Sequence, residues 1–258
     1  MNRIKIGFFD SGVGGISVMT CARKVLPFAD YYYYADEEHV PYGTKCREEI
    51  IRYADEAVDY LVRCGVDAVV VACNTATSIA IEYLREKYDL PIIGMEPALK
   101  PAAKIHPTEN ILLCATAVTI AGEKLHHLIE TSGVQPTLVP LPGLVTFAER
   151  GEFDKDTVCA YLKAAIGENK EFAAVVLGCT HFSYFRDCFR ELFGAGVDII
   201  DGNAGTVKRL ISVLGERITT ADDSSGKAIY SVSGKAATNE RIAEFDLLAK
   251  RYESVLDA

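Results

Sequence analysis

The sequence of 258 residues contains no tryptophan and no Cys-x-x-Cys pair among its eight cysteines. The missing pair argues against zinc knuckles and thioredoxin-like redox chemistry. No secretory signal precedes the first apolar segment, so we expect free thiols rather than disulfides. The five histidines show no ligand spacing with the cysteines, and the sequence therefore predicts no metal site.

Positive charge and long apolar runs are also scarce. The chain has 27 lysines and arginines against 36 aspartates and glutamates, which gives a net charge of −9. Nucleic acids and anionic membranes demand a basic face, so neither is expected as a partner. No stretch approaches the roughly 18 apolar residues that a membrane span needs. Because nothing at the N-terminus looks like a targeting segment, we expect the protein in the cytoplasm.

What the sequence does contain is a regular alternation of short apolar runs and amphipathic stretches. Runs rich in valine and isoleucine, without polar alternation, are typical of parallel strands covered on both faces. The pattern predicts an α/β fold with mostly parallel sheets and right-handed crossovers. The expected strands are 4–9, 31–35, 66–72, 91–94, 110–116, 136–141, 172–178, 197–200 and 229–234. The expected helices are 15–26, 47–63, 75–88, 121–130, 154–166, 180–193, 205–218 and 239–256, with a polar loop at 219–228.

One internal repeat connects the two halves of the chain. The stretch AVVVACNT (68–75) and the stretch AVVLGCTH (174–181) each end an apolar run on a cysteine, and the first copy carries one extra valine. Duplication of an α/β unit would explain the repeat. If the two copies face each other, Cys73 and Cys179 lie on opposite walls of one cleft. The alternative is a pair of buried core cysteines without a role in catalysis.

Two such thiols suit a reaction at one carbon atom. Parallel sheets bind ligands at the carboxyl ends of their strands, where both cysteines are expected. A following helix N-terminus lowers a thiol pKa from about 8.5 toward neutrality. One thiolate can then remove a proton from one face of a carbon while the other thiol delivers a proton to the opposite face. The result is inversion at that carbon.

Neighbouring residues fit a small anionic substrate. Asp10 and Ser11, in FDSGVGG (9–15), end the first strand on the same sheet edge as the thiols. The glycines there do not form a dinucleotide or P-loop fingerprint. Tyr42, in VPYGTK (40–45), is placed to close over a substrate, and His181 to poise Cys179. Neutral hydrogen-bond donors for carboxylate oxygens are offered by Asn74, Thr75, Thr116, Thr119 and Thr180.

The motifs FDSGVGG, VPYGTK, ACNTA, GMEPA (94–98) and LGCTH, in this order and spacing, resemble those of the glutamate racemases of the aspartate/glutamate racemase family. The resemblance implies two pseudo-symmetric α/β domains with the active site in the cleft between them. The first domain would comprise residues 1–97 and 208–258, and the second residues 98–207. The resemblance further implies racemisation of glutamate without a cofactor, supply of D-glutamate for peptidoglycan, and a homodimer.

The same resemblance implies roles for individual residues. Cys73 and Cys179 would be the two acid/base thiols, with Asp10 and His181 as their polar helpers. The implied substrate-binding residues are Asp10, Ser11, Pro41, Tyr42, Gly43, Asn74, Thr75, Thr116, Thr119, Glu149, Thr180 and His181. Ala121 and residues 124–127 depart from the family pattern, which often has a serine and then a tyrosine there. Some members are activated by a cell-wall precursor with help from an N-terminal extension. This chain begins almost at its first strand, so we do not expect that regulation.

Three alternatives stay open on the sequence. A related aspartate racemase is one, although the histidine of LGCTH favours glutamate because the similar aspartate enzymes usually carry an acidic residue there. A thiol hydrolase using Cys179 and His181 would form an acyl-enzyme and would not need Cys73. A binding module would hold the amino acid without exchanging its α-hydrogen. Two thiols make pyridoxal phosphate unnecessary.

Overall fold

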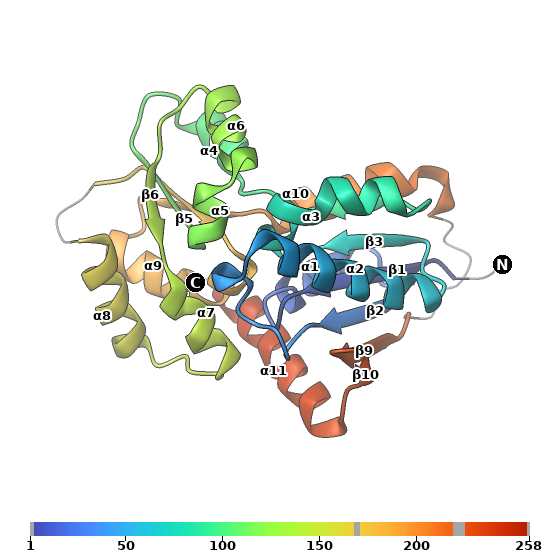
Figure 1. Cartoon of the computed structure of the whole chain (residues 1–258). Helices are drawn as coiled ribbons and strands as arrows, with labels where there is room; N and C mark the ends of the chain where they lie inside the picture. The colour runs from blue at the N-terminus through green and yellow to red at the C-terminus, as the bar shows by residue number, and fades with distance from the viewer. Residues whose placement is uncertain (1–2, 168–170, 219–224, 257–258) are drawn as a thin grey trace.

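The computed structural model describes residues 3–167, 171–218 and 225–256, and its strands form two sheets. The larger sheet has the order β10-β9-β2-β1-β3-β4, and all its neighbours are parallel except β9 and β10. Its strands are β1 (Lys5–Asp10), β2 (Asp30–Ala35), β3 (Ala68–Val71), β4 (Ile92–Gly94), β9 (Ala228–Val232) and β10 (Lys235–Ala236). Figure 1 shows this sheet on the right, and we call the part of the molecule around it the first lobe.

The smaller sheet is built from the middle of the chain and lies on the left of Figure 1, in what we call the second lobe. Its order is β6-β5-β7-β8, with every neighbouring pair parallel. Its strands are β5 (Ile111–Ala115), β6 (Thr137–Pro140), β7 (Ala174–Gly178) and β8 (Asp198–Asp201). The predicted α/β class with mostly parallel sheets is confirmed. The predicted domain boundaries stay a prediction.

Helices cover both faces of each sheet. The first lobe contains α1 (Ile16–Val25), η1 (Tyr42–Thr44), α2 (Arg47–Arg63), α3 (Asn74–Lys87), α10 (Asn203–Leu214), η3 (Gly215–Arg217) and α11 (Asn239–Leu256). The second lobe contains α4 (Leu99–Ile105), α5 (Ala117–Ala121), α6 (Glu123–Ser132), α7 (Pro142–Glu149), α8 (Lys155–Ile166), η2 (Thr180–Phe185) and α9 (Arg186–Phe193). In the described part of the chain, no helix combines the length and hydropathy that a membrane crossing requires.

The continuous apolar runs follow from this double coverage. In β3, Val70 packs into the core beside α1, whereas Val69 and Val71 pack against α2 and α3 on the other face. In β7, Val175 and Val176 divide between two cores in the same way. A strand buried on both faces has no position for a polar residue, which is why the sequence shows no alternation.

The sequence missed the short helices of the second lobe. The helix α7 begins at Pro142, where the missing N–H costs nothing, but a Pro-Gly pair is more typical of a turn. The helix predicted over 121–130 is observed as α6, and the short helix α5 before it was missed; the extended backbone at Gly122 separates the two. The helix predicted over 180–193 begins as the 3-10 segment η2. Much of the polar loop predicted at 219–228 lies outside the described residues.

The last helix connects the two lobes. Helix α11 packs against α1 of the first lobe and against η2 and α9 of the second. Its Arg251 donates to the carbonyl of Tyr184 at 3.0 Å and to both carboxylate oxygens of Asp187 at 2.7 and 2.8 Å. In this ion pair Nη2 of the arginine contacts both oxygens, and the pair is mostly shielded from water, with side-chain exposures of 23% for the arginine and 19% for the aspartate.

Replacing Arg251 by methionine is expected to lower the free energy of unfolding by about 2 kcal/mol, because the change removes hydrogen bonds to a charged partner. The matched control is Lys155→Met, which removes the exposed ion pair between Lys155 and Glu191. That change should cost less than about 1 kcal/mol. Urea denaturation of the two variants measures both values. Equal losses would contradict the role given to Arg251.

Candidate active site

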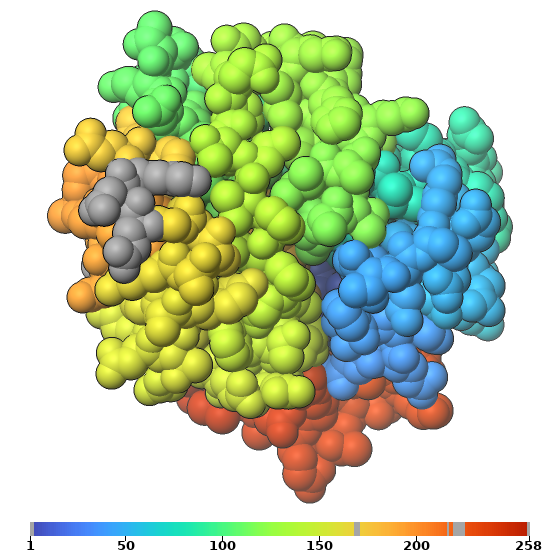
Figure 2. Space-filling model, turned by 60° about the vertical axis from the view of Figure 1, so that its left-hand side comes forward, coloured from blue at the N-terminus to red at the C-terminus, as the bar shows by residue number. Residues whose placement is uncertain are grey.

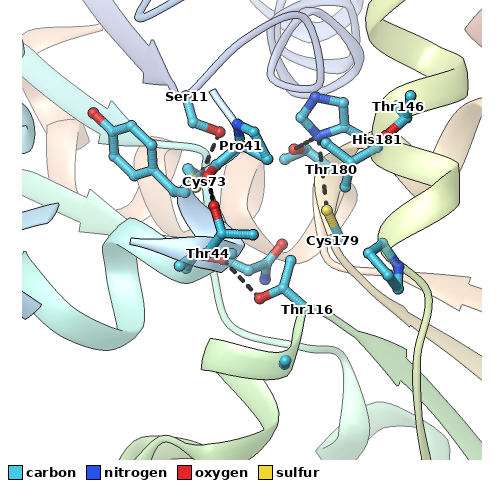
Figure 3. Close-up of a pocket in the computed structure, with 16 residues that line it drawn as sticks. Ser11, Pro41, Thr44, Cys73, Thr116, Thr146, Cys179, Thr180 and His181 are labelled. Carbon is cyan, nitrogen blue, oxygen red and sulfur yellow. Dashed lines mark hydrogen bonds between the residues drawn. The ribbon is translucent and has the colours of Figure 1, made fainter. Parts of the chain in front are cut away.

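The carboxyl ends of strands from both sheets meet at one cavity of about 350 Å³. Cys73 follows β3 of the first lobe and Cys179 follows β7 of the second, and both line the cavity. Figure 3 shows the two cysteines entering it from opposite sides. In Figure 2 a hollow opens between the blue segment of the first lobe and the green-to-yellow surface of the second lobe.

Most of the residues proposed from the sequence line this cavity. These are Ser11, Pro41, Tyr42, Gly43, Cys73, Asn74, Thr75, Thr116, Cys179, Thr180 and His181. The sequence analysis missed Thr44, Ala117, Pro142, Val145 and Thr146, which also line it. Thr44 lies within the VPYGTK stretch directly after Gly43, so extending the predicted site residues by one position would have found it. The last three lie on α7, and only recognition of that helix would have found them.

Cys73 is nearly buried, with 5% of its surface exposed, and it caps the N-terminus of α3. Its Sγ accepts the backbone N–H of Ala76 at 3.4 Å and donates to Oγ of Ser11 at 3.6 Å. Burial, and then the charge of Asp10, raise the pKa of Cys73 to about 12. The sequence predicted that the helix N-terminus lowers the pKa of Cys73. In the structure, desolvation of the thiol outweighs the hydrogen bond from the N–H of Ala76.

Asp10 ends β1 and lies behind the cavity wall, fully buried. Its Oδ1 accepts the N–H of Gly12 at 3.1 Å, and its Oδ2 accepts the hydroxyl of Thr180 at 3.1 Å. Burial raises the pKa of Asp10 to about 6 despite the opposing effect of His181. Asp10 therefore reaches the cavity through Thr180, which belongs to the other lobe.

Cys179 is paired with a histidine rather than with a helix. Its Sγ lies 3.7 Å from Nδ1 of His181, and Nε2 of the same ring lies 2.6 Å from Oε1 of Glu149. Burial by itself would lower the pKa of His181, but its hydrogen bonds with Cys179 and Glu149 outweigh burial and raise the pKa well above the ordinary value. Both hydrogen bonds thus favour the protonated ring, in which both nitrogens are donors.

Glu149 does not line the cavity that holds the thiols. Its Oε1 accepts the backbone N–H of Val13 at 3.0 Å in addition to the bond from His181. The side chain instead faces a second cavity of about 380 Å³, whose wall includes Phe153 and Arg251. Glu149 therefore acts on the first cavity only by orienting His181.

Three hydroxyl groups join the lobes beside the cavity. Oγ1 of Thr75 lies 2.9 Å from Oγ1 of Thr116 and 3.3 Å from Oγ1 of Thr119, and the last two lie 3.0 Å apart. Thr119 does not line the cavity and supports Thr116 from behind.

Asn74 donates to the carbonyl of Met95 at 3.1 Å, while its buried Oδ1 has no partner among the described residues.

Charge on the cavity wall is confined to His181, because none of the described residues that line it is a lysine, an arginine or a carboxylate. In residues 3–167, 171–218 and 225–256, no group of three or more His, Cys, Asp or Glu side chains is placed to hold a metal ion. The arrangement offers two thiols, several hydroxyl and amide groups, and a histidine. It can therefore exchange protons at a bound molecule and hold its carboxylates by neutral donors.

Comparison with known proteins agrees with a site that exchanges protons at a bound molecule. Residues 17–210 match the model of the Asp/Glu/hydantoin racemase family. A glutamate racemase of Halothermothrix orenii is 46% identical over 237 residues, covering 90% of this chain and 94% of that protein. Glutamate racemase 2 of Bacillus subtilis is 42% identical over 260 residues, covering 98% and 97%.

A solved structure agrees over nearly the whole chain. Escherichia coli glutamate racemase, in complex with L-glutamate and the activator UDP-MurNAc-Ala, superposes with a TM-score of 0.82 and 28% identity. The match covers 97% of this chain and 96% of that one. With a family match over residues 17–210 and relatives above 40% identity, this chain belongs to the Asp/Glu/hydantoin racemase family.

Proposed function

We propose that the protein interconverts L- and D-glutamate without a cofactor, with Cys73 and Cys179 as the two acid/base thiols. The observation that carries the proposal is that both thiols line one small cavity at the ends of corresponding strands. Relatives that cover almost the whole chain are named glutamate racemase, which supports glutamate as the substrate.

In the proposed reaction the α-carbon of glutamate lies between the two sulfur atoms. The thiolate on one side removes the α-proton, and the thiol on the other side donates its proton to the opposite face. One C–H bond breaks and one forms, so the substrate leaves with inverted configuration and the two cysteines have exchanged protonation states. The α-hydrogen is a very weak acid, and the fixed hydroxyl and amide dipoles around the cavity stabilise the negative charge that develops.

The surroundings of Cys73 define its protonation state in the empty site. The high pKa of Cys73 keeps it as a thiol in the empty site, ready to donate a proton. When Cys73 has to act as the base, the positive ammonium group of the bound amino acid favours the thiolate.

The wider role of the enzyme follows from the family resemblance. We propose that it works in the cytoplasm as a homodimer and supplies D-glutamate for peptidoglycan. Glutamate and aspartate carry the same charges and differ by one methylene group. Initial rates with both amino acids therefore test the substrate directly, and faster racemisation of aspartate would replace glutamate in this proposal.

Substituting either thiol is expected to abolish racemisation. Each of Cys73→Ala and Cys179→Ala should lower kcat at least about 100-fold, because each removes one of the two acid/base groups. The measurement follows optical rotation and α-deuterium together, starting from L-glutamate in deuterated water. Wild type should form D-glutamate that carries deuterium at the α-carbon.

The matched control is Cys64→Ala, a cysteine at the C-terminal end of α2 and outside the cavity, which should keep wild-type turnover. If either active-site variant keeps wild-type turnover, the two-thiol mechanism is wrong. An acyl-enzyme on Cys179 that forms without Cys73 would indicate a hydrolase. Binding of glutamate with no α-deuterium uptake by wild type would indicate a binding module.

The pH dependence of kcat/KM should show the protonation of Asp10. The carboxylate form accepts the bonds from Gly12 and Thr180, and its pKa is raised to about 6 by burial. Protonation below that pH removes the form that holds Thr180, so we expect kcat/KM to fall about tenfold per pH unit below about pH 6. Asp10→Asn should be slower throughout but lack this acid limb. An unchanged limb in the variant would assign it to another group.

A further inference from the structure

A second buried carboxylate lies beside Asp10 and takes no part in the proposed reaction. Asp36 directly follows β2, has 2% of its surface exposed, and donates its backbone N–H to the carbonyl of Asp10 at 3.1 Å. Taking a carboxylate out of water is costly unless hydrogen bonds replace the water. The donors that surround Asp36 therefore indicate what this carboxylate is for.

The shortest of these bonds comes from the cavity wall. The hydroxyl of Tyr42 donates to Oδ2 of Asp36 at 2.6 Å. Tyr42 is 1% exposed, lines the cavity, and packs its ring against Phe9 and Tyr53. Burial, and then the charge of Asp36, raise the pKa of Tyr42 far above its ordinary value, so the phenol stays a donor.

Two further groups hold the carboxylate itself. Nδ1 of His39 lies 2.8 Å from Oδ1 of Asp36, and the imidazole stacks on the ring of Tyr53 with 3.7 Å between centroids. The hydroxyl of Ser233 donates to the same Oδ1 at 3.4 Å and accepts the N–H of Glu38 at 3.0 Å. Asp36 is thus fixed by His39, which stacks on Tyr53 of α2, and by Ser233 in the turn between β9 and β10.

The chain around Tyr42 forms the side of the cavity that faces the second lobe. Tyr42 begins η1, which packs against α5 of that lobe, and both Tyr42 and Gly43 line the cavity. We propose that Asp36, held by His39 and Ser233, is a positioning residue that fixes Tyr42 and Gly43 as the first-lobe wall of the substrate site. This proposal rests on the proposed racemase function.

A wall that contacts the substrate in the same way throughout the reaction contributes equally to the ground state and the transition state. Loss of its anchor therefore raises KM and leaves kcat nearly unchanged. A merely structural role for Asp36 would instead lower thermal stability and the amount of active enzyme, with the KM of the folded fraction unchanged. The two roles are thus separable by steady-state kinetics.

The test is a double-mutant cycle of Asp36→Ala and Tyr42→Phe, with KM and kcat measured for both enantiomers. Each single change should raise KM about tenfold, the size of one hydrogen bond to a charged group. Because both remove the same bond, the double variant should be no worse than the poorer single variant within a factor of about two. Asp36→Asn keeps an acceptor for the phenol and should restore most of the affinity.

The matched control is His106→Ala, since His106 also lies between carboxylates, those of Glu109 and Asp198, but outside the cavity. That variant should keep the wild-type KM. Folded Asp36→Ala with an unchanged KM, or additive effects in the cycle, would overturn the inference. If Asp36→Ala does not fold, the cycle is run with His39→Ala, which should raise KM in the same direction, and an unchanged KM there is equally decisive. Inactive wild type would instead overturn the proposed function.

Discussion

The close approach of the second lobe to the turn after β1 is the constraint on which the site depends. A side chain at Gly12 would overlap the carboxylate of Glu149, and a side chain at Gly14 would overlap the hydroxyl of Thr180 and lie 2.6 Å from Nδ1 of His181. Only glycine leaves room for the second lobe to bring these groups against the first. Gly12 and Gly14 therefore serve packing between the lobes rather than phosphate binding. Without this contact, Cys179 and Cys73 would not share a cavity.

Across this contact the two lobes exchange hydrogen-bonding groups. Asp10 of the first lobe holds Thr180 of the second, and Thr75 of the first holds Thr116 of the second. Each of these bonds is buried, so separating the lobes would leave a charged or polar group without a partner in a region of low dielectric. The polar groups that surround the substrate site are for this reason also groups that keep the cleft in shape.

The sequence predicted the class of fold and the two thiols because both depend on local patterns. A strand buried on both faces needs an unbroken apolar run, and the repeat at Cys73 and Cys179 marks two equivalent strand ends. The sequence placed Glu149 among the substrate-binding residues. It could not show that this side chain faces the second cavity, because that depends on how distant parts of the chain pack. Asp36 was missed because its partners, among them Ser233 about two hundred residues away, meet it only in the fold.

The repeat also hides an asymmetry that arises from packing. Cys73 caps an α-helix beside a buried carboxylate, whereas Cys179 precedes a 3-10 segment and faces His181. In the proposed reaction the two thiols therefore act from different surroundings. Enantiomers have equal free energies in water, so this difference cannot favour one product at equilibrium. At an equilibrium constant of one, kcat/KM for the L-enantiomer must equal kcat/KM for the D-enantiomer. The difference between the thiols can therefore change kcat for one enantiomer relative to the other only if it changes KM by the same factor. The unequal surroundings of the sulfur atoms can thus make KM differ between the enantiomers, while the direction of net flux is set by the concentrations of the two enantiomers outside the enzyme.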